Sequence, residues 1–185
     1  MSPRILSGDL RGRVLARSNE RGVRPPLART RRSLLDSLRP RLPGARVLDV
    51  FAGSGSLAFE CLSRGAASAV LVEGNGEVAR SLKASIVTLG LHERARVIRG
   101  DAFTSLRRIA ESGPAFELAF LDPPFADERG ADLLSLTAPV LEPGGMAVLR
   151  HPVRRPLPAL AGPLRLVRSS RDGGSITGFY DKEGL

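Results

Sequence analysis

The sequence predicts an α/β fold with a Rossmann-like, mostly parallel sheet and an antiparallel hairpin at its carboxyl-terminal end. After Gly44, short apolar runs alternate with longer amphipathic runs. Strands separated by helices are joined by right-handed crossovers, which produce a parallel sheet with helices on both faces. Near the end, the runs RLVRSS and SITGFY flank a turn at Asp172, Gly173 and Gly174. Two such runs joined by a glycine-containing turn indicate a hairpin at one sheet edge.

The individual elements follow from the period of the apolar residues. Buried parallel strands are short apolar runs, and amphipathic helices repeat every three to four residues. The expected strands are 46–50, 69–72, 95–98, 116–121 and 146–149, and the expected helices are 57–64, 77–89, 104–111 and 131–140.

The composition changes once, near Pro43 and Gly44, and this change predicts two parts. Residues 1–43 are rich in arginine and interrupted by glycine and proline, so we expect an extension without a core of its own. Residues 5–6 and 14–15 can pair in a short hairpin around 8–12, and 29–38 reads as a basic helix ended by Pro40. Residues 44–185 form the predicted main domain.

The charge of the chain indicates a nucleic-acid partner. The 185 residues carry a formal net charge of +9, and the excess is arginine, whose planar guanidinium binds phosphate through two parallel hydrogen bonds. With few aromatic residues between them, these arginines suit phosphate contact better than base stacking, and binding should weaken steeply with salt. The alternative is a solvated arginine-rich face that reflects coding bias. The proposed contacts are Arg4, Arg11, Arg13, Arg24, Arg29, Arg31 and Arg32.

Several function classes are disfavoured by composition. The single cysteine, Cys61, lies in an apolar helical run, so no disulfide framework or cysteine cluster is expected. His92 and His151 are far apart and read as surface or loop histidines, so no metal site is predicted. No apolar run approaches the about 18 residues that span a bilayer, and no signal-peptide region is recognisable. We expect a soluble cytoplasmic protein.

Ligands of such sheets bind beyond the carboxyl ends of the strands, and the first strand is followed there by DVFAGSGS. Gly53 and Gly55 allow a tight turn and close approach of the backbone to a ligand. The loop lacks the third glycine of a dinucleotide fingerprint and the lysine of a P-loop, so it does not predict a diphosphate site. The alternative is a plain strand-to-helix turn.

Acidic residues end the next two predicted strands. Glu73, about twenty residues beyond the glycine turn, can accept two hydrogen bonds from a ribose diol. Asp101 can accept from an adenine amino group while the Ala102 amide contacts the ring nitrogen. The alternatives are a solvated acid at a strand end and a helix N-cap. Together the three loops outline an adenosine-shaped site that fits S-adenosylmethionine better than NAD or ATP.

The motif LDPPF follows the fourth strand. The two prolines remove amide donors, so the loop presents carbonyls and the Asp122 carboxylate as acceptors. Acceptors that hold both hydrogens of an exocyclic base amine turn its lone pair toward a methyl donor, and Phe125 offers a face on which the base stacks. The alternative is a proline-rich turn that buries a phenylalanine.

The pair DVFAGSGS and DPPF resembles the S-adenosylmethionine-dependent amino methyltransferases. More narrowly, RILSGDLRGRVL, VLDVFAGSGSLAFECLSRGAASAVLVE, FLDPPF, LEPGGMAVLRHP and GGSITGFY are similar to the bacterial 16S ribosomal RNA guanine-N2 methyltransferase family. The resemblance implies a seven-stranded class I methyltransferase fold and methylation of one guanine amine in 16S rRNA. It also implies action on small ribosomal subunits rather than naked RNA, and we expect a monomer.

The resemblance carries roles to matching positions. It implies cofactor contacts at Asp49, Phe51, Ala52, Gly53, Ser54, Gly55, Glu73, Asp101 and Ala102, and a catalytic tetrad of Asp122, Pro123, Pro124 and Phe125. The chain departs from the family pattern at Pro26, Leu27, Ala28 and Arg32, has Arg150 where glutamate is common, and has Phe125 where tyrosine is more frequent. These departures concern substrate contacts or efficiency more than cofactor chemistry.

Two other functions remain open at this point. A DNA adenine or cytosine amino methyltransferase would use the same tetrad, although the chain has no room for a large target-recognition domain. A catalytically degenerate RNA-binding protein on the same fold would explain the departures. Failure to bind S-adenosylmethionine would favour this last reading.

Overall fold

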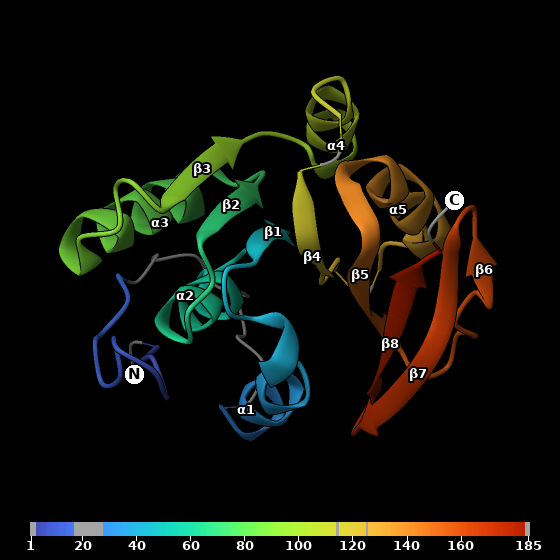
Figure 1. The fold of residues 1–185 in the computed structure, drawn as a ribbon, viewed down its shortest axis with the longest axis horizontal. Coiled ribbons are helices and arrows are strands. Elements are labelled where there is room, and N and C mark those ends of the chain that lie inside the picture. Colours follow the sequence, from blue (N-terminus) through green and yellow to red (C-terminus); the bar gives the residue numbers. More distant parts are fainter. Residues whose placement is uncertain (1–2, 17–27, 114, 125, 184–185) are drawn as a thin grey trace. The chain divides into compact units, whose positions relative to one another are not determined.

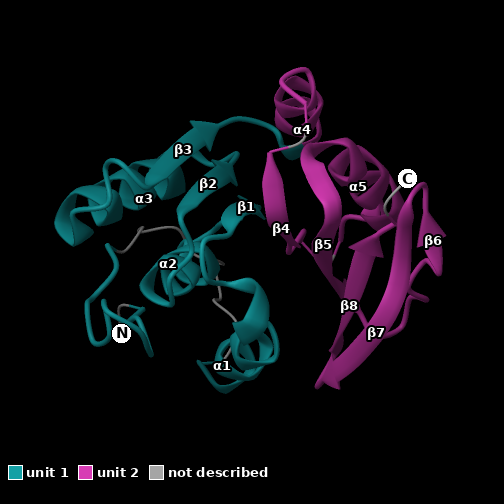
Figure 2. Cartoon of the chain, viewed as in Figure 1, with its two compact units in different colours: residues 1–102 teal, residues 103–185 magenta. Residues whose placement is uncertain are grey.

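The structure, a computed structural model, describes residues 3–16, 28–113, 115–124 and 126–183. The chain forms two compact units, Met1–Ala102 and Phe103–Leu185, which Figure 2 colours separately. The predictions for Arg24, Pro26, Leu27 and Phe125 fall outside the described residues, and the predicted boundary between 43 and 44 stays a prediction.

Unit 1 contains three parallel strands, β1 (Arg46–Val50), β2 (Ser68–Glu73) and β3 (Ala95–Arg99), in the order β3-β2-β1 (Figure 1). β1 and β2 are buried almost throughout, as the apolar sequences RVLDV and SAVLVE require for strands covered on both faces. In the β1–β2 register Val50 lies opposite Val72, so the loops after these strands begin side by side.

Two helices of unit 1 precede these strands, and two connect them. They are α1 (Ala28–Ser37), the short 3-10 helix η1 (Arg39–Arg41), α2 (Ser56–Ser63) and α3 (Gly76–Leu89). α2 packs against β1 and β2, and α3 packs against β2 and β3. The Asn75 side chain accepts the amides of Glu77 and Val78 and so caps the start of α3, and Gly90, with φ +69°, follows its last residue, Leu89.

Residues 3–16 form the predicted hairpin, with a single bridge between Arg4 and Val14. It docks on α2 so closely that a Cβ at Gly8 would stand 1.8 Å from the Ser63 carbonyl oxygen. Ser63 also accepts the amides of Asp9 and Leu10 at 2.8 and 2.9 Å. The RILSG motif therefore has a structural reason, because only glycine fits this contact with φ +81°.

Unit 2 contains the remaining strands, β4 (Phe116–Leu121), β5 (Leu141–Pro152), β6 (Leu160–Ala161), β7 (Leu164–Asp172) and β8 (Ser175–Lys182). Their order is β4-β5-β8-β7-β6, with β4 and β5 parallel and the later pairs antiparallel. Its helices are α4 (Ala102–Ala110), which begins one residue before the unit, α5 (Gly130–Thr137) and the 3-10 helix η2 (Ala138–Val140).

The predicted α/β class and the carboxyl-terminal hairpin, β7–β8, are confirmed. Three details differ. β5 runs for twelve residues instead of four, because it pairs with β8 along most of its length. The described residues include the two-residue β6, which lies beyond the hairpin and which no sequence pattern indicated. His151 lies inside β5 and is only 5% exposed, so its assignment to the surface was wrong.

Candidate functional site

The loop after β1 has the conformation that its glycines predict. Gly53 and Gly55 have φ of +53° and +70°, and a Cβ on Gly55 would stand 2.5 Å from the Phe59 ring and 2.6 Å from Leu82. The loop therefore closes over α2 and α3 at a position that only glycine can occupy. Ala52 and Gly55 are buried, and Phe51, Gly53 and Ser54 are half-buried.

Phe51 shows strain that the sequence did not reveal. Among the described residues other than glycine, it is the one with positive φ, at +64°. A bulky side chain in this region costs of order 1 to 3 kcal/mol and persists where the surrounding structure imposes it. Such strain clusters at ligand sites, which agrees with the predicted place of Phe51 in the cofactor loop.

The two acids nearest the loop fix its shape from within. Asp49 is 1% exposed, and its Oδ2 accepts the Ala58 amide of α2 at 3.3 Å. Glu73 is half-buried, and its Oε2 and Oε1 accept the amides of Gly53 at 2.9 Å and Asn75 at 2.8 Å. Glu73 thus ties the loop after β1 to the loop after β2, while its carboxylate retains lone pairs for a ligand.

The loop after β3 reaches the same place. The Gly100 amide donates to the Glu73 carbonyl at 3.1 Å, and the exposed Asp101 follows directly. Ala102, 5% exposed, begins α4. The structure therefore brings together the ends of β1, β2 and β3, as predicted. Backbone open to close approach and two accessible carboxylates fit an adenosine group that carries hydroxyl and amino donors.

The LDPP segment leaves β4 at the corresponding end of the strand in unit 2. Asp122 is half-buried, Pro123 is buried and Pro124 is exposed. The Pro124 carbonyl accepts the Asp127 amide at 2.8 Å, so this carbonyl closes a turn. Burial raises the pKa of Asp122, and the Arg150 guanidinium, 3.4 Å from Oδ2, acts in the opposite direction.

The loop that follows is held by arginines that sequence reasoning missed. The Arg129 guanidinium binds both Asp127 oxygens, at 2.9 and 2.8 Å, and its hydrogen bonds lower the Asp127 pKa. Arg129 also lies 3.9 Å over the Phe103 ring, a cation–π contact. Arg155 donates to the Asp127 carbonyl at 3.0 Å and to Glu128 at 2.7 Å. The turn after the prolines is therefore anchored at several points.

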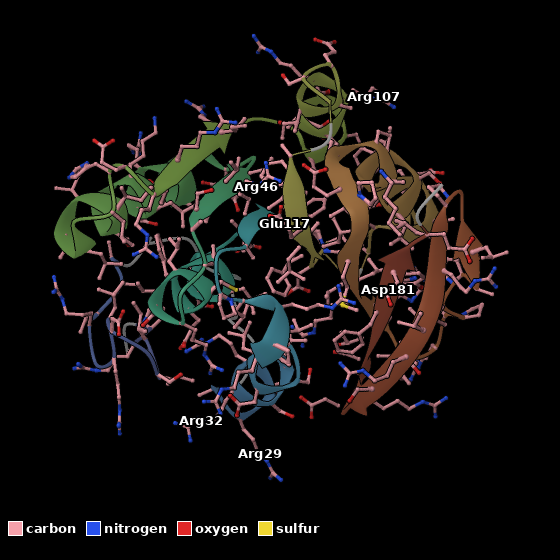
Figure 3. All side chains as sticks on the ribbon, viewed as in Figure 1. Arg29, Arg32, Arg46, Arg107, Glu117 and Asp181 are labelled. Atoms are coloured by element: carbon pink, nitrogen blue, oxygen red, sulfur yellow. The ribbon has the colours of Figure 1, made fainter. Side chains whose placement is uncertain are left out.

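The predicted RNA-facing arginines divide into two groups. Arg4, Arg11, Arg13, Arg29 and Arg32 are exposed, and Figure 3 shows Arg29 and Arg32 extending outward from α1. Arg31 is 3% exposed and donates to the Arg4 carbonyl at 2.9 Å. A guanidinium enclosed by protein cannot reach a phosphate, so the structure contradicts an RNA role for Arg31.

Arg31 belongs instead to a buried ionic cluster centred on Glu60 of α2. Glu60 is fully buried and lies 3.5 Å from Arg31 Nε and 3.7 Å from Arg64 Nε. Its Oε1 also accepts the Leu6 amide at 2.6 Å. A glutamate in the apolar run LAFECLS was the available sequence signal, because a buried carboxylate requires partners.

Within the part of the chain that the structure describes, no group of three or more histidine, cysteine, aspartate or glutamate side chains is arranged to hold a metal ion. Nor does any described helix combine the length and apolar character that crossing a bilayer requires.

Comparison with known proteins gives a consistent result. The profile of a family described as Conserved hypothetical protein 95 matches residues 3–181. The "Ribosomal RNA small subunit methyltransferase D" of Escherichia coli strain K12 is 35% identical over 186 residues, covering 97% of this chain and 90% of the relative. The solved Escherichia coli protein yhhF, a proposed methyltransferase, matches with a TM-score of 0.88 and 32% identity over 100% of both chains.

A more distant solved protein shows the shared fold alone. SMU.776, a proposed methyltransferase complexed with SAH, is 11% identical and matches with a TM-score of 0.65. The match covers 78% of this chain and 48% of that protein.

Proposed function

The chain belongs to the family described as Conserved hypothetical protein 95, and from this premise we propose that it methylates the exocyclic N2 amine of one guanine in 16S rRNA. The cofactor is S-adenosylmethionine, held by the loops after β1, β2 and β3. The broader assignment, an rRNA methyltransferase, agrees with the Escherichia coli relative, which is named as a small-subunit methyltransferase.

The observation that carries the proposal is the half-buried Asp122 at the end of β4, followed by two prolines. A guanine amine is a weak nucleophile because its lone pair is delocalised into the ring. The Asp122 carboxylate accepts an amine hydrogen, and Pro123, which lacks an amide donor, keeps competing donors away from the same place. Bound S-adenosylmethionine supplies a methyl group on a positively charged sulfur. As the N–C bond forms and the C–S bond breaks, the surplus amine proton leaves to solvent, and Asp122 fixes the direction of attack.

The unit 1 residues supply cofactor binding in this proposal. The Glu73 carboxylate, already held by two backbone amides, accepts from the ribose hydroxyls, and the exposed Asp101 accepts from the adenine amine. Asp49 is buried, so its role is to support the loop through Ala58. Gly53 and Gly55 let the backbone lie against the ligand.

The exposed arginines near the amino terminus supply the RNA contact. Arg4, Arg11 and Arg13 lie on the hairpin that docks on α2, and Arg29 and Arg32 lie on α1. Guanidinium groups there bind phosphates without regard to sequence, so they position the RNA and do not select the base. The target guanine must be unpaired or flipped out, because an amine within a base pair cannot reach the methyl group. A cytoplasmic, monomeric enzyme remains our expectation.

The test is transfer of labelled methyl from S-adenosylmethionine to three acceptors, followed by digestion to nucleosides. The acceptors are small subunits that lack the modification, naked 16S rRNA and duplex DNA. Label in N2-methylguanosine, strongest on the subunits, supports the proposal. Label in a DNA base refutes the RNA substrate and favours the DNA amino methyltransferase. Absence of label despite cofactor binding favours the degenerate RNA-binding protein.

A further inference from the structure

Arg150 and Asp122 occupy matching positions on neighbouring strands. In the parallel pairing of β4 and β5, Leu121 lies opposite Leu149, so the residues that follow them, Asp122 and Arg150, emerge side by side. Arg150 Nη1 lies 3.4 Å from Asp122 Oδ2. Their side chains are 26% and 24% exposed, which places the pair in a partly desolvated position where charges interact more strongly than at the surface.

The second arm of the guanidinium is held by β8. Arg150 Nη2 donates to Ser175 Oγ at 3.2 Å. Ser175 is 5% exposed and pairs with Pro152 in the β5–β8 register, so its position is fixed by the sheet. The fork of Arg150 therefore spans from the β8 strand to the Asp122 carboxylate, and its planar geometry leaves little freedom to either arm.

Within the described part of unit 2, Arg150 is the charged group that shifts the pKa of Asp122. Burial raises this pKa, and both the charge of Arg150 and its hydrogen bond lower it. The neighbouring charges of the loop are paired with each other, Asp127 with Arg129 and Glu128 with Arg155. The titratable groups on the surrounding elements are Glu117 of β4, Glu142 and His151 of β5, Tyr180, Asp181 and Lys182 of β8, Asp132 of α5, and Asp127, Glu128, Arg129 and Arg155 of the loops.

We propose that Arg150 is a positioning residue that keeps the Asp122 carboxylate ionised and fixed in orientation, and that Ser175 holds Arg150 in place for this purpose. The proposal rests on the amine-methylating function proposed above. A protonated Asp122 would present a hydroxyl donor to an amine that itself carries donors, whereas the ionised form only accepts. Arg150 thereby sets the pH below which the enzyme stops working.

Burial raises the pKa of Asp122 and Arg150 lowers it. Removing Arg150 leaves burial unopposed, so the pKa of Asp122 rises further and a higher pH is needed to ionise the carboxylate. Because kcat/KM reports the free enzyme, the acid limb of its pH profile moves to higher pH in the same variant. A residue that served only packing would lower activity at every pH by the same factor.

The first experiment follows the Asp122 carboxyl carbon by NMR in the full-length protein without substrate, with the resonance assigned by its loss in Asp122→Asn. In Arg150→Met we expect the pKa of Asp122 to be about 1 unit higher than in the wild type, from the usual effect of an adjacent opposite charge. Arg150→Lys keeps the charge and should restore most of the difference. Ser175→Ala should produce a smaller rise. Arg171→Met on the exposed part of β7 is the matched control and should produce none.

The second experiment measures kcat/KM against pH with the RNA acceptor. The acid limb should move with the NMR pKa in each variant, so that well below the wild-type pKa the Arg150→Met enzyme is about tenfold less active, the factor that one pKa unit represents. An unchanged pKa in both Arg150→Met and Ser175→Ala overturns the inference. If the NMR pKa moves but no RNA is methylated, the Asp122–Arg150 coupling stands and the proposed function fails. If N2-methylguanosine forms but neither the pKa of Asp122 nor the acid limb of the pH profile moves, the proposed function stands and the coupling between Asp122 and Arg150 fails.

Discussion

Replacing Glu60 by alanine should destabilise unit 1 more than any exposed charge substitution. Glu60 is fully buried and contacts Arg31 Nε at 3.5 Å, Arg64 Nε at 3.7 Å and the Leu6 amide at 2.6 Å. Its removal leaves the buried Arg31 guanidinium without its counter-ion, which typically costs about 3 to 5 kcal/mol. It also orphans the Leu6 amide, a loss of about 1 to 3 kcal/mol that partly overlaps the first. We therefore expect the free energy of unfolding to fall by about 3 to 5 kcal/mol.

The assay is urea unfolding of the full chain followed by circular dichroism, together with hydrogen exchange of residues 3–16. Glu60→Ala should lower the midpoint and speed exchange of the docked hairpin. Glu77→Ala is the matched control, because Glu77 is an exposed helical glutamate of the same unit, 3.7 Å from Arg80, and such pairs contribute under about 1 kcal/mol. Replacing both Arg31 and Glu60 by methionine should recover much of the lost free energy of unfolding, because neither buried side chain is then charged and no desolvation penalty arises. A Glu60→Ala loss no larger than that of Glu77→Ala would refute the reasoning.

Four further outcomes are expected. Glu73→Ala removes the acceptor of the Gly53 and Asn75 amides. It should weaken S-adenosylmethionine binding, measured by calorimetry, by at least about tenfold, which corresponds to the loss of one hydrogen bond to a charged group. Unchanged affinity would exclude Glu73 from the cofactor site. Asp122→Ala should abolish methyl transfer while leaving the cofactor affinity measured by calorimetry largely intact, and an active Asp122→Ala enzyme would remove Asp122 from the mechanism. Phe125→Tyr should keep most of the methyl-transfer rate because it retains an aromatic face. Burial raises the pKa of Cys61 well above its ordinary value, so a thiol reagent at pH 8 should label it only as fast as the chain opens; rapid labelling of the native protein would contradict its buried position.

The sequence predicted the alternation of strands and helices well because each element in the middle of the chain carries a clear period. The strand at 46–50 and the helix at 77–89 differ from β1 and α3 by at most one residue at an end. The long β5 was underestimated because the expected strand covered only the apolar run at 146–149, whereas pairing with β4 begins at Leu141 and pairing with β8 continues to Pro152. A local sequence pattern does not reveal which distant strands will pair.

The candidate site followed the same rule. The glycine turn and the acid at Glu73 were visible because their spacing along the chain carries the signal, and the structure brings them within hydrogen-bonding distance. The contact between Asp122 and Arg150 could not be read from the sequence, because it depends on the register of β4 against β5. Arg31 was misassigned for a related reason, since an arginine in a basic run looks exposed until its distant partner Glu60 is known.

The amino-terminal hairpin packs on the two helices that follow the loops proposed to bind the cofactor. Glu60 and Ser63 of α2 hold the hairpin through hydrogen bonds, and the hydroxyl of Ser85 on α3 accepts the Ala16 amide at 2.9 Å. α2 begins at the glycine turn, and α3 begins just after Glu73. The hairpin arginines proposed to contact RNA and the loops proposed to contact the nucleoside are thus connected through α2 and α3. Linkage requires that any change in cofactor affinity caused by RNA binding be matched by an equal change in RNA affinity caused by cofactor binding, so either measurement tests whether this connection couples the two sites.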